Sequence, residues 1–235
     1  MDEGYLDIHS HVIYGVDDGS KSLEMSLKML EKSYEEGVRK MVATPHNYPG
    51  KDPKLAQIRE RYGELREKTR ERFPDFTLLL GNEILYRKAI VSDIREGRAL
   101  TIGGSEYVLV EFLPREELRN IYDGLWDLVR AGYRPIVAHI ERTRLPEDPR
   151  TVRELGEMGC ELQVNTEIIT GGLFNRMTGK ILDLIGDGRI RYLGTDCHNL
   201  TDRAPRYRDA FRKLERKNLQ FAIEKSEDFL YSNIG

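Results

Sequence analysis

Cysteine is scarce in this sequence, since Cys160 and Cys197 are the only two among 235 residues. Two cysteines cannot form the disulfide framework of a small secreted domain, so we expect a cytoplasmic protein. Long apolar runs are also absent: no window of about 18 uncharged apolar residues occurs, so no membrane insertion is expected. The N-terminus is acidic and polar, unlike the basic and then apolar order of a secretory signal peptide.

An excess of positive charge is missing as well. The chain carries 37 Lys and Arg against 40 Asp and Glu, for a net charge of −3. No nucleic-acid partner is therefore expected, because general nucleic-acid binding usually shows as a basic excess. Neither a P-loop nor the glycine fingerprint of flavin and nicotinamide enzymes occurs, and Gly103-Gly104 reads only as a turn. These absences argue against enzymes that depend on a P-loop or on a dinucleotide cofactor.

The residues that are present suffice for one folded core. Hydrophobic residues make up 39% of the chain, and the charged 33% are well mixed in sign. A length of 235 residues predicts a single catalytic domain over residues 1–235, which lies within the size range of an α/β barrel. No low-complexity linker divides the chain.

Short apolar segments alternate with helix-like segments along the whole chain. Seven apolar segments predict β-strands, at Tyr5–His9, Lys40–Thr44, Phe76–Leu80, Tyr107–Val110, Arg134–Ala138, Cys160–Val164 and Ile190–Gly194. Helices are predicted over 23–34, with Ser22 as N-cap, and over 55–72, 121–130, 151–158, 173–185 and within 205–230. The segment 84–101 is looser and predicts one short strand and one short helix. This alternation favours a parallel sheet.

Most of the predicted strands end in a residue type that binds metal ions. The pair His9 and His11 points to one face of a strand, although such a pair alone is more often two ordinary histidines. All five histidines, however, follow apolar runs. The candidate ligands are His9, His11, Asp18, His46, Glu83, Glu111, His139, Asp196 and His198. Because these strand ends must converge on one point, we predict a closed, distorted seven-stranded β/α (TIM-like) barrel.

This ligand set indicates hydrolytic chemistry. Mixed imidazole and carboxylate ligands suit Zn, Mn or Fe, and nine ligands imply two or three ions with at least one bridging carboxylate. Such a centre lowers the pKa of bound water and clamps the oxygens of an in-line displacement. Arg142 and Arg203 follow His139 and His198 closely, and a planar guanidinium can hold phosphate through two hydrogen bonds. The combination predicts a phosphoester substrate.

A competing motif begins at Cys197, which together with Arg203 fits the C-x5-R loop of thiol-based phosphatases. This copy lacks the glycine that such a loop needs, and Ala204 replaces the usual hydroxyl residue. Its His198 is better used as a metal ligand. We therefore favour a buried or incidental Cys197, since a reactive cysteine needs a depressed pKa.

Taken in order, these motifs resemble a known family. The similarity runs through D-I-H-S-H, Y-G-V-D-D-G-S-K-S, A-T-P-H, G-N-E-I, V-E-F, I-V-A-H-I-E-R and T-D-C-H-N-L with Arg203. The chain resembles the PHP (polymerase and histidinol phosphatase) superfamily and, within it, the CpsB/YwqE-type bacterial manganese-dependent protein-tyrosine phosphatases. Asp18 and Glu111 stand where many PHP proteins have histidine, which points to the tyrosine-phosphatase branch.

The resemblance implies three divalent ions, with manganese first and iron or zinc as alternatives. It implies one ion held by His9, His11, Glu83 and Asp196. A second would be held by Glu83, Glu111 and His139, with Glu83 bridging, and a third by Asp18, His46 and His198. Arg142 and Arg203 would contact the phosphate as catalytic residues while a metal-activated hydroxide attacks phosphorus. The implied partner is a phosphotyrosine protein, a bacterial tyrosine kinase of capsule or exopolysaccharide synthesis.

Two other functions remain open from the sequence. One is a small-molecule phosphomonoesterase such as histidinol phosphatase. The other is a non-catalytic PHP regulatory module, against which the complete ligand set argues. Asp202 and Glu141 can be considered as general acids, but each reads better as a structural or surface carboxylate, and Asp7 reads as structural support for the ligands.

Overall fold

The computed structural model describes residues 4–51, 54–171 and 176–223. Within them, nine strands form two parallel sheets with the orders β1-β2-β4 and β3-β5-β6-β7-β8-β9. The strands are β1 (Tyr5–Ser10), β2 (Val38–Ala43), β3 (His46–Asn47), β4 (Thr77–Leu80), β5 (Glu83–Leu85), β6 (Tyr107–Glu111), β7 (Arg134–Val137), β8 (Glu161–Asn165) and β9 (Tyr192–Gly194).

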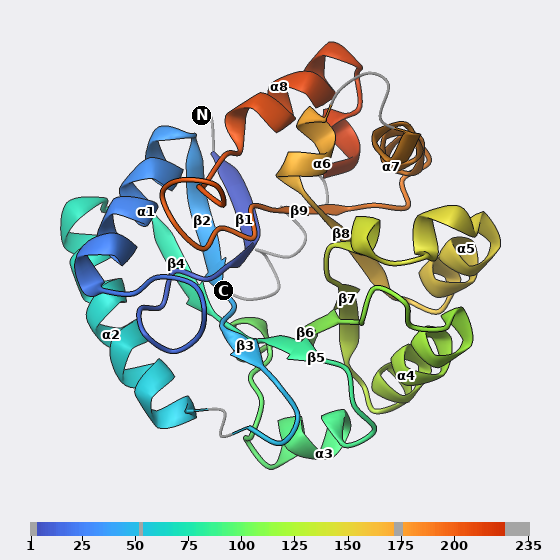
Figure 1. Ribbon diagram of the computed structural model, residues 1–235, viewed down its shortest axis with the longest axis horizontal. Helices are drawn as coiled ribbons and strands as arrows, with labels where there is room; N and C mark the ends of the chain where they lie inside the picture. The colour runs from blue at the N-terminus through green and yellow to red at the C-terminus, as the bar shows by residue number, and fades with distance from the viewer. Residues whose placement is uncertain (1–3, 52–53, 172–175, 224–235) are drawn as a thin grey trace.

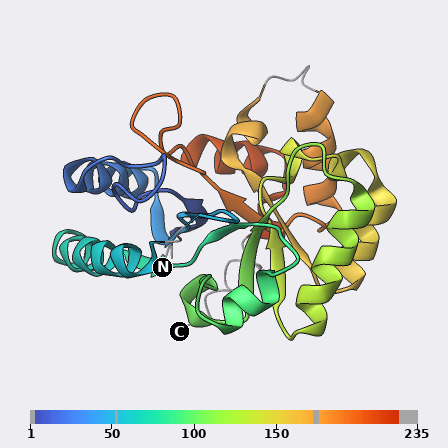
Figure 2. The ribbon, with the colours of Figure 1, turned by 60° about the horizontal axis from the view of Figure 1, so that its bottom comes forward.

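Helices surround the strands on the outside (Figure 1). They are α1 (Leu23–Glu35), α2 (Leu55–Arg72), α3 (Ile90–Arg95), α4 (Leu118–Arg130), α5 (Pro149–Glu157), α6 (Thr166–Thr170), α7 (Arg176–Gly186) and α8 (Arg208–Arg216), with 3-10 turns at Ile102–Gly104, Ile140–Arg142 and Leu145–Glu147. Figure 2 shows α1 and α2 together on one side of the molecule and α4, α5 and α7 on the other. None of the described helices is long and apolar enough to cross a membrane.

The predicted elements are largely confirmed, with local differences. Ser22 caps α1 by accepting a hydrogen bond from the Met25 amide at 3.2 Å. The helix α2 has the predicted bounds, and β5 and α3 are the short strand and helix expected within 84–101. The helix α6 was not predicted. Parts of the helices predicted over 173–185 and 205–230 lie outside the described residues, namely 173–175 and 224–230.

The predicted parallel α/β architecture is confirmed, but one continuous seven-stranded barrel sheet is not seen among the described residues. The sheets divide where β2 passes into β3 and β4 into β5. Pro45, at the first of these breaks, has no amide hydrogen to donate to a ladder. Two hydrogen bonds fix the chain there. The Gly81 amide donates to Ala43 O at 2.9 Å, and the Asn82 side-chain amide donates to Pro45 O at 2.8 Å.

The first and last strands meet just beyond their carboxyl ends. Ser10 and Cys197 form a parallel bridge, and the His11 amide donates to Cys197 O at 2.9 Å. The Asp196 amide donates to His9 O at 2.8 Å. This junction joins β1 to the segment that follows β9, two parts of the chain that lie far apart in the sequence.

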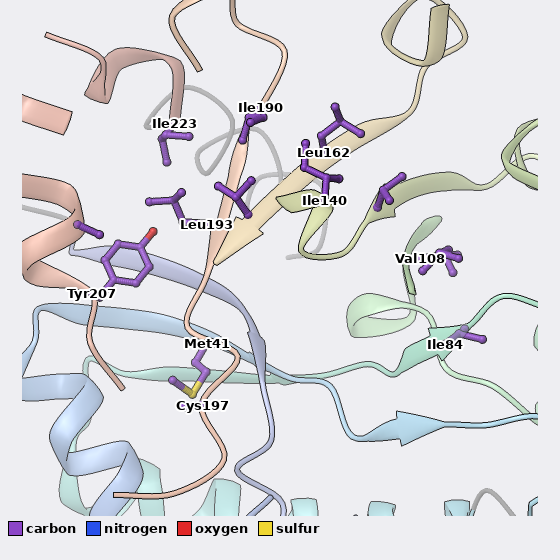
Figure 3. Close-up of a cluster of buried hydrophobic side chains, with 14 of the residues drawn as sticks. Met41, Ile84, Val108, Ile140, Leu162, Ile190, Leu193, Cys197, Tyr207 and Ile223 are labelled. Carbon is purple, nitrogen blue, oxygen red and sulfur yellow. The ribbon is translucent and has the colours of Figure 1, made fainter. Parts of the chain in front are cut away.

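The core lies on both faces of the sheets, as expected for parallel strands covered by helices. Alternate residues of β6 separate the two parts, with Tyr107 and Leu109 in an inner cluster and Val108 and Val110 in an outer one. Figure 3 shows part of the outer cluster, which includes Cys197. Buried on both faces, the strand ends are fixed in position by packing, and they carry the polar residues described next.

Candidate metal centre

The nine predicted ligands lie together at the carboxyl ends of the strands. His9 belongs to β1, His46 to β3, Glu83 to β5 and Glu111 to β6, while the others follow β1, β7 and β9 directly or by a short loop. All but Asp18 are buried or partly buried; the Asp18 side chain is 64% exposed. His139 and Asp196 have φ angles of 29° and 49°, a left-handed conformation that costs energy in residues other than glycine and is found at functional sites.

Glu83 is the carboxylate on which most of the histidines converge. Its Oε1 lies 2.7 Å from His139 Nε2. Its Oε2 lies 3.3 Å from the Nε2 atoms of both His9 and His11, and 2.8 Å from His46 Nδ1. Burial alone would raise the pKa of Glu83, but the surrounding histidines hold it well below its ordinary value, so the side chain stays ionised.

Glu111 stands at the edge of the same group, 3.8 Å from His139 Nε2. Its pKa is raised by burial and then by the charge of Glu83. Two carboxylates that share a site repel one another, and a cation between them relieves the repulsion. The set His46, Glu83 and Glu111 has its ligand atoms close enough to hold one ion, as does the set His9, Glu83 and His139.

Asp18 contacts a second group of predicted ligands, His46 and His198. Its Oδ1 lies 3.3 Å from His46 Nε2 and 3.4 Å from His198 Nε2. These three residues and His11 form another set whose ligand atoms lie close enough for one ion. Burial, and then the charge of His11, lowers the pKa of His198 to about 4, which keeps its imidazole neutral as metal binding requires.

Asp196 completes the group on the His9 and His11 side. Its Oδ1 lies 3.6 Å from His9 Nε2 and 3.4 Å from His11 Nε2, and the three residues form a further set suited to one ion. Its Oδ2 accepts hydrogen bonds from Arg142 Nη2 at 2.7 Å and from Asn165 Nδ2 at 3.0 Å, and it forms an ion pair with Arg203 Nη2 at 2.7 Å. Both arginine side chains are partly exposed, at 43% and 34%, so they can also face a bound anion.

The donor set fits divalent ions. Three buried candidate ligand atoms, His46 Nδ1, Glu83 Oε2 and His198 Nε2, contact imidazole or carboxylate groups without hydrogen-bond geometry, and among the described residues they have no hydrogen-bond partner. Burial alone would lower the pKa of His11, but hydrogen bonds to the carboxylates of Asp17 and Glu83 raise it to about 10. The negative charge of these carboxylates therefore favours a positive charge at this position. Orphaned buried polar atoms are costly, and coordination to a cation would satisfy them.

Supporting residues that the sequence reasoning did not assign hold the ligands in place. Asp17 Oδ2 accepts from His11 Nδ1 at 2.8 Å and from the His46 amide at 3.2 Å, while its Oδ1 accepts from the Gly19 amide. The bond to Nδ1 leaves Nε2 of His11 free to coordinate. The consecutive acids Asp17 and Asp18 in one loop were the available signal.

Gln163 likewise holds two other predicted ligands, His9 and His139, in position. Its Oε1 lies 3.3 Å from His9 Nδ1 and accepts from the His139 amide at 2.8 Å. Gln163 and Asn165 alternate along β8, where two polar residues on one face of an otherwise apolar strand could have been noticed. The prediction for Asp7 agrees with its contacts, since it accepts hydrogen bonds from the amides of Thr195 and His9.

The two carboxylates considered as general acids have other contacts. Glu141 accepts from the Asn165 amide at 3.1 Å, and burial raises its pKa to about 7. Asp202 is exposed and accepts from the Thr201 hydroxyl.

Cys197 does not have the surroundings of a nucleophile. Its side chain is fully buried in the outer apolar cluster (Figure 3), and burial raises the pKa of its thiol. Arg203, the other end of the C-x5-R pattern, contacts Asp196 instead. A thiol-based mechanism therefore has no support in the geometry.

Comparison with known proteins places these features in a family context. Residues 5–233 match the CpsB/CapC family of capsular polysaccharide synthesis. The chain is 31% identical to the tyrosine-protein phosphatase CpsB of Streptococcus pneumoniae, covering 97% of this chain and 96% of that protein. It is 27% identical to the tyrosine-protein phosphatase YwqE of Bacillus subtilis, covering 97% and 92%.

Solved structures with a similar fold include members of the same group of phosphatases. One chain from crystal structures of YwqE from Bacillus subtilis and CpsB from Streptococcus pneumoniae, described as metal-dependent tyrosine phosphatases, superposes with a TM-score of 0.87. It is 26% identical, with 97% of this chain and 95% of that chain covered. A histidinol phosphate phosphatase from Lactococcus lactis superposes with a TM-score of 0.61 over 92% of this chain and 93% of its own, at 15% identity, which shows a shared fold alone.

Proposed function

The chain belongs to the CpsB/CapC family of capsular polysaccharide synthesis proteins, and from that membership we propose that it is a metal-dependent tyrosine-protein phosphatase. The observation that carries the proposal is the convergence of nine imidazole and carboxylate side chains at the strand ends, with two partly exposed arginines on Asp196. Metal-type ligands on one side and guanidinium groups on the other are what a phosphoryl group requires.

Three divalent ions, with manganese first and iron or zinc as alternatives, are proposed for the centre. His9, His11, Glu83 and Asp196 would hold one ion, and Glu83, Glu111 and His139 a second. Asp18, His46 and His198 would hold the third. The four overlapping ligand sets contain the same nine residues but divide them differently. They keep His9, His11 and Asp196 together and add His11 to the group around Asp18. They place Glu83 with His9 and His139 in one set and with His46 and Glu111 in another. Such ions supply Lewis-acid stabilisation of phosphoryl oxygens and activation of water.

The chain's own residues bind and orient the substrate. Arg142 and Arg203 have guanidinium groups held beside Asp196 and partly open to solvent, so they can bind two oxygens of a phosphoryl group and neutralise the charge that builds on them. Asn165 fixes Asp196 through the same oxygen. Since a phenolate is a fairly good leaving group, a strong general acid is not required.

The proposed substrate is phosphotyrosine on a protein, namely a bacterial tyrosine kinase that acts in capsule or exopolysaccharide synthesis. The family and its named relatives support the capsule context. A cytoplasmic location and a single domain over residues 1–235 remain predictions.

We also propose that the two sheets act as one distorted barrel of seven chain segments. The β2–β3 and β4–β5 pairs are each separated by only two residues, and β1 meets the chain after β9 at Ser10 and Cys197. The breaks occur beside His46 and Glu83, where the strand ends turn toward the centre.

Substrate choice tests the function. The protein is loaded with Mn²⁺, and turnover of a phosphotyrosine peptide is compared with turnover of histidinol phosphate. We expect preference for the peptide, loss of activity with a chelator and recovery on adding Mn²⁺. A preference for histidinol phosphate would replace this function with a small-molecule phosphatase. No hydrolysis of any phosphoester would favour a regulatory module.

A further inference from the structure

A groove extends from the candidate centre between α6 and α8, which lie side by side in Figure 1. Its volume is about 440 Å³. The inner end is formed by Arg142, Asp196 and Arg203, the same residues that close the centre. A molecule whose phosphoryl group sits at the two arginines can therefore continue into this space, which we call the α6–α8 groove.

The outer part of the α6–α8 groove is lined by cationic side chains of α8. Arg212 and Arg216 are exposed and lie one helical turn apart, so both project over the same stretch of the groove. Neither makes an ion pair with any residue in the described ranges. Lys213 lies between them and donates to the Gly171 carbonyl at 2.9 Å, which ties α8 to the end of α6.

The charge of the lining differs in sign from that of the whole protein. The α6–α8 groove has six cationic side chains, namely Arg142, Arg203, Arg206, Arg212, Lys213 and Arg216, against the four carboxylates Glu167, Asp196, Asp202 and Asp209. The complete chain has a net charge of −3. Arg142 and Arg203 pair with Asp196, whereas Arg212 and Arg216 form no ion pair within the described ranges. Cations that gather in one groove of an acidic protein are complementary to an anionic ligand.

We propose that the α6–α8 groove binds acidic side chains of the polypeptide on one side of the phosphotyrosine. This inference rests on the proposed phosphatase function and adds a substrate class, since it selects phosphotyrosines that have Asp or Glu nearby. The nine residues of α8 span about 13 Å, and an extended peptide covers that length with about four residues. The selected carboxylates therefore lie within about four or five positions of the phosphotyrosine.

Peptides matched in length test the proposal. Each carries one phosphotyrosine, with glutamates on its N-terminal side, glutamates on its C-terminal side, or lysines in both places. For the Mn²⁺-loaded wild type we expect kcat/KM for one of the glutamate peptides to exceed that for the lysine peptide by about tenfold at low salt, because several partly exposed charges act together. The advantage should shrink as salt is raised.

The double variant Arg212→Glu/Arg216→Glu should reverse or abolish this preference. Arg95→Glu, a single exposed substitution of the same kind on α3 at the opposite edge of the molecule (Figure 1), is the control and should keep it. Equal glutamate-to-lysine ratios for the double variant and the wild type, or no preference in the wild type, would overturn the proposal.

Turnover of free phosphotyrosine distinguishes a failure of the groove proposal from a failure of the proposed phosphatase function. It is too short to reach the outer arginines, so its turnover reports on the centre alone in every variant. If the wild type hydrolyses no phosphotyrosine in any form, the proposed function itself fails. If free phosphotyrosine is hydrolysed but the peptides show no charge preference, only the groove assignment fails.

Discussion

Asp17 controls the orientation of two proposed ligands without being one itself. It accepts hydrogen bonds from His11 Nδ1 and from the amides of His46 and Gly19. An amide has one acceptor oxygen, so Asp17→Asn cannot satisfy all three donors. We expect Mn²⁺ affinity to fall by about 10- to 100-fold, measured by titrating metal into the metal-free protein. Unchanged affinity would show that the loop backbone alone positions His11.

Cys197 and His139 distinguish metal chemistry from thiol chemistry. Cys197 is buried in apolar surroundings, whereas His139 contacts Glu83 at the centre. Cys197→Ser should keep most of the phosphatase activity and lower the thermal midpoint, because it buries a hydroxyl group among apolar side chains. His139→Ala should abolish activity. The reverse pair of results, read from kcat on phosphotyrosine and from thermal unfolding, would require a thiolate mechanism.

Most of the proposed ligands could be selected from the sequence because each follows an apolar run. His9, His46 and His139 could be assigned to strand ends from the sequence alone, and the structure brings them to Glu83. The supports Asp17 and Gln163 were not assigned, because a carboxylate or amide that only holds an imidazole has no spacing of its own in the sequence.

At the scale of elements, the connection from β5 to α3 depends on one carboxylate. Asp93 accepts from Arg87 Nε at 2.5 Å and from Arg98 Nε at 2.9 Å. Arg87 in turn donates to Asn47, which follows His46 on β3. This cluster therefore connects α3 to a strand that carries a proposed ligand.

Asp93→Asn should destabilise the protein in a pH-dependent way. Burial raises the pKa of Asp93, but the two arginines lower it more, so the net pKa is below the usual value. A lowered pKa means that the stabilisation is present above the unfolded-state value of about 4 and is lost as the pH falls below it. We expect a loss of about 1–3 kcal/mol at pH 7, or roughly 2–10 °C in thermal midpoint, that becomes smaller as the pH falls from about 4 through the lowered pKa of Asp93. A loss of the same size at pH 3 and pH 7 would contradict the charged interaction.

Long elements were predicted better than short ones. The helix α2 has 18 residues, and its bounds followed from the sequence. The helix α6 has five residues, fewer than two turns, so its apolar residues show no period to detect. The two-residue strand β3 is a strand because it pairs with β5, not because of its own composition. Pairing between segments that are distant in the chain cannot be predicted from the local sequence.

At the scale of the whole molecule, bound metal should contribute to stability. The centre brings the buried Glu83 and Asp196 together with the partly buried Glu111, and cations would relieve the repulsion between these carboxylates. Metal at 100 times its dissociation constant stabilises the folded state by about 2.7 kcal/mol per independent site. We expect Mn²⁺ to raise the thermal midpoint by roughly 5–10 °C for each ion that binds independently, and a chelator to reverse the rise. An equal rise in His139→Ala would show that the ions bind elsewhere.

The general arrangement of the molecule could be inferred from sequence because parallel strands must present their carboxyl ends on one side. The division into two sheets could not be inferred, since it depends on how the chain turns at Thr44-Pro45 and Gly81-Asn82. The α6–α8 groove was equally invisible, because its walls come from an unpredicted helix and from a basic helix that resembles an ordinary charged surface.

The meeting of the first and last strands has a consequence for biosynthesis. Asp7 and Thr195, which are hydrogen-bonded, are separated by 188 positions in the chain, and the proposed ligands His9 and His198 lie beside them. A polypeptide leaves the ribosome from its N-terminus, so His9 and His11 are synthesised long before Asp196 and His198. Premature termination before residue 196 would release a chain that carries seven of the nine proposed ligands but lacks Asp196 and His198. Such incomplete translation products should therefore lack phosphatase activity.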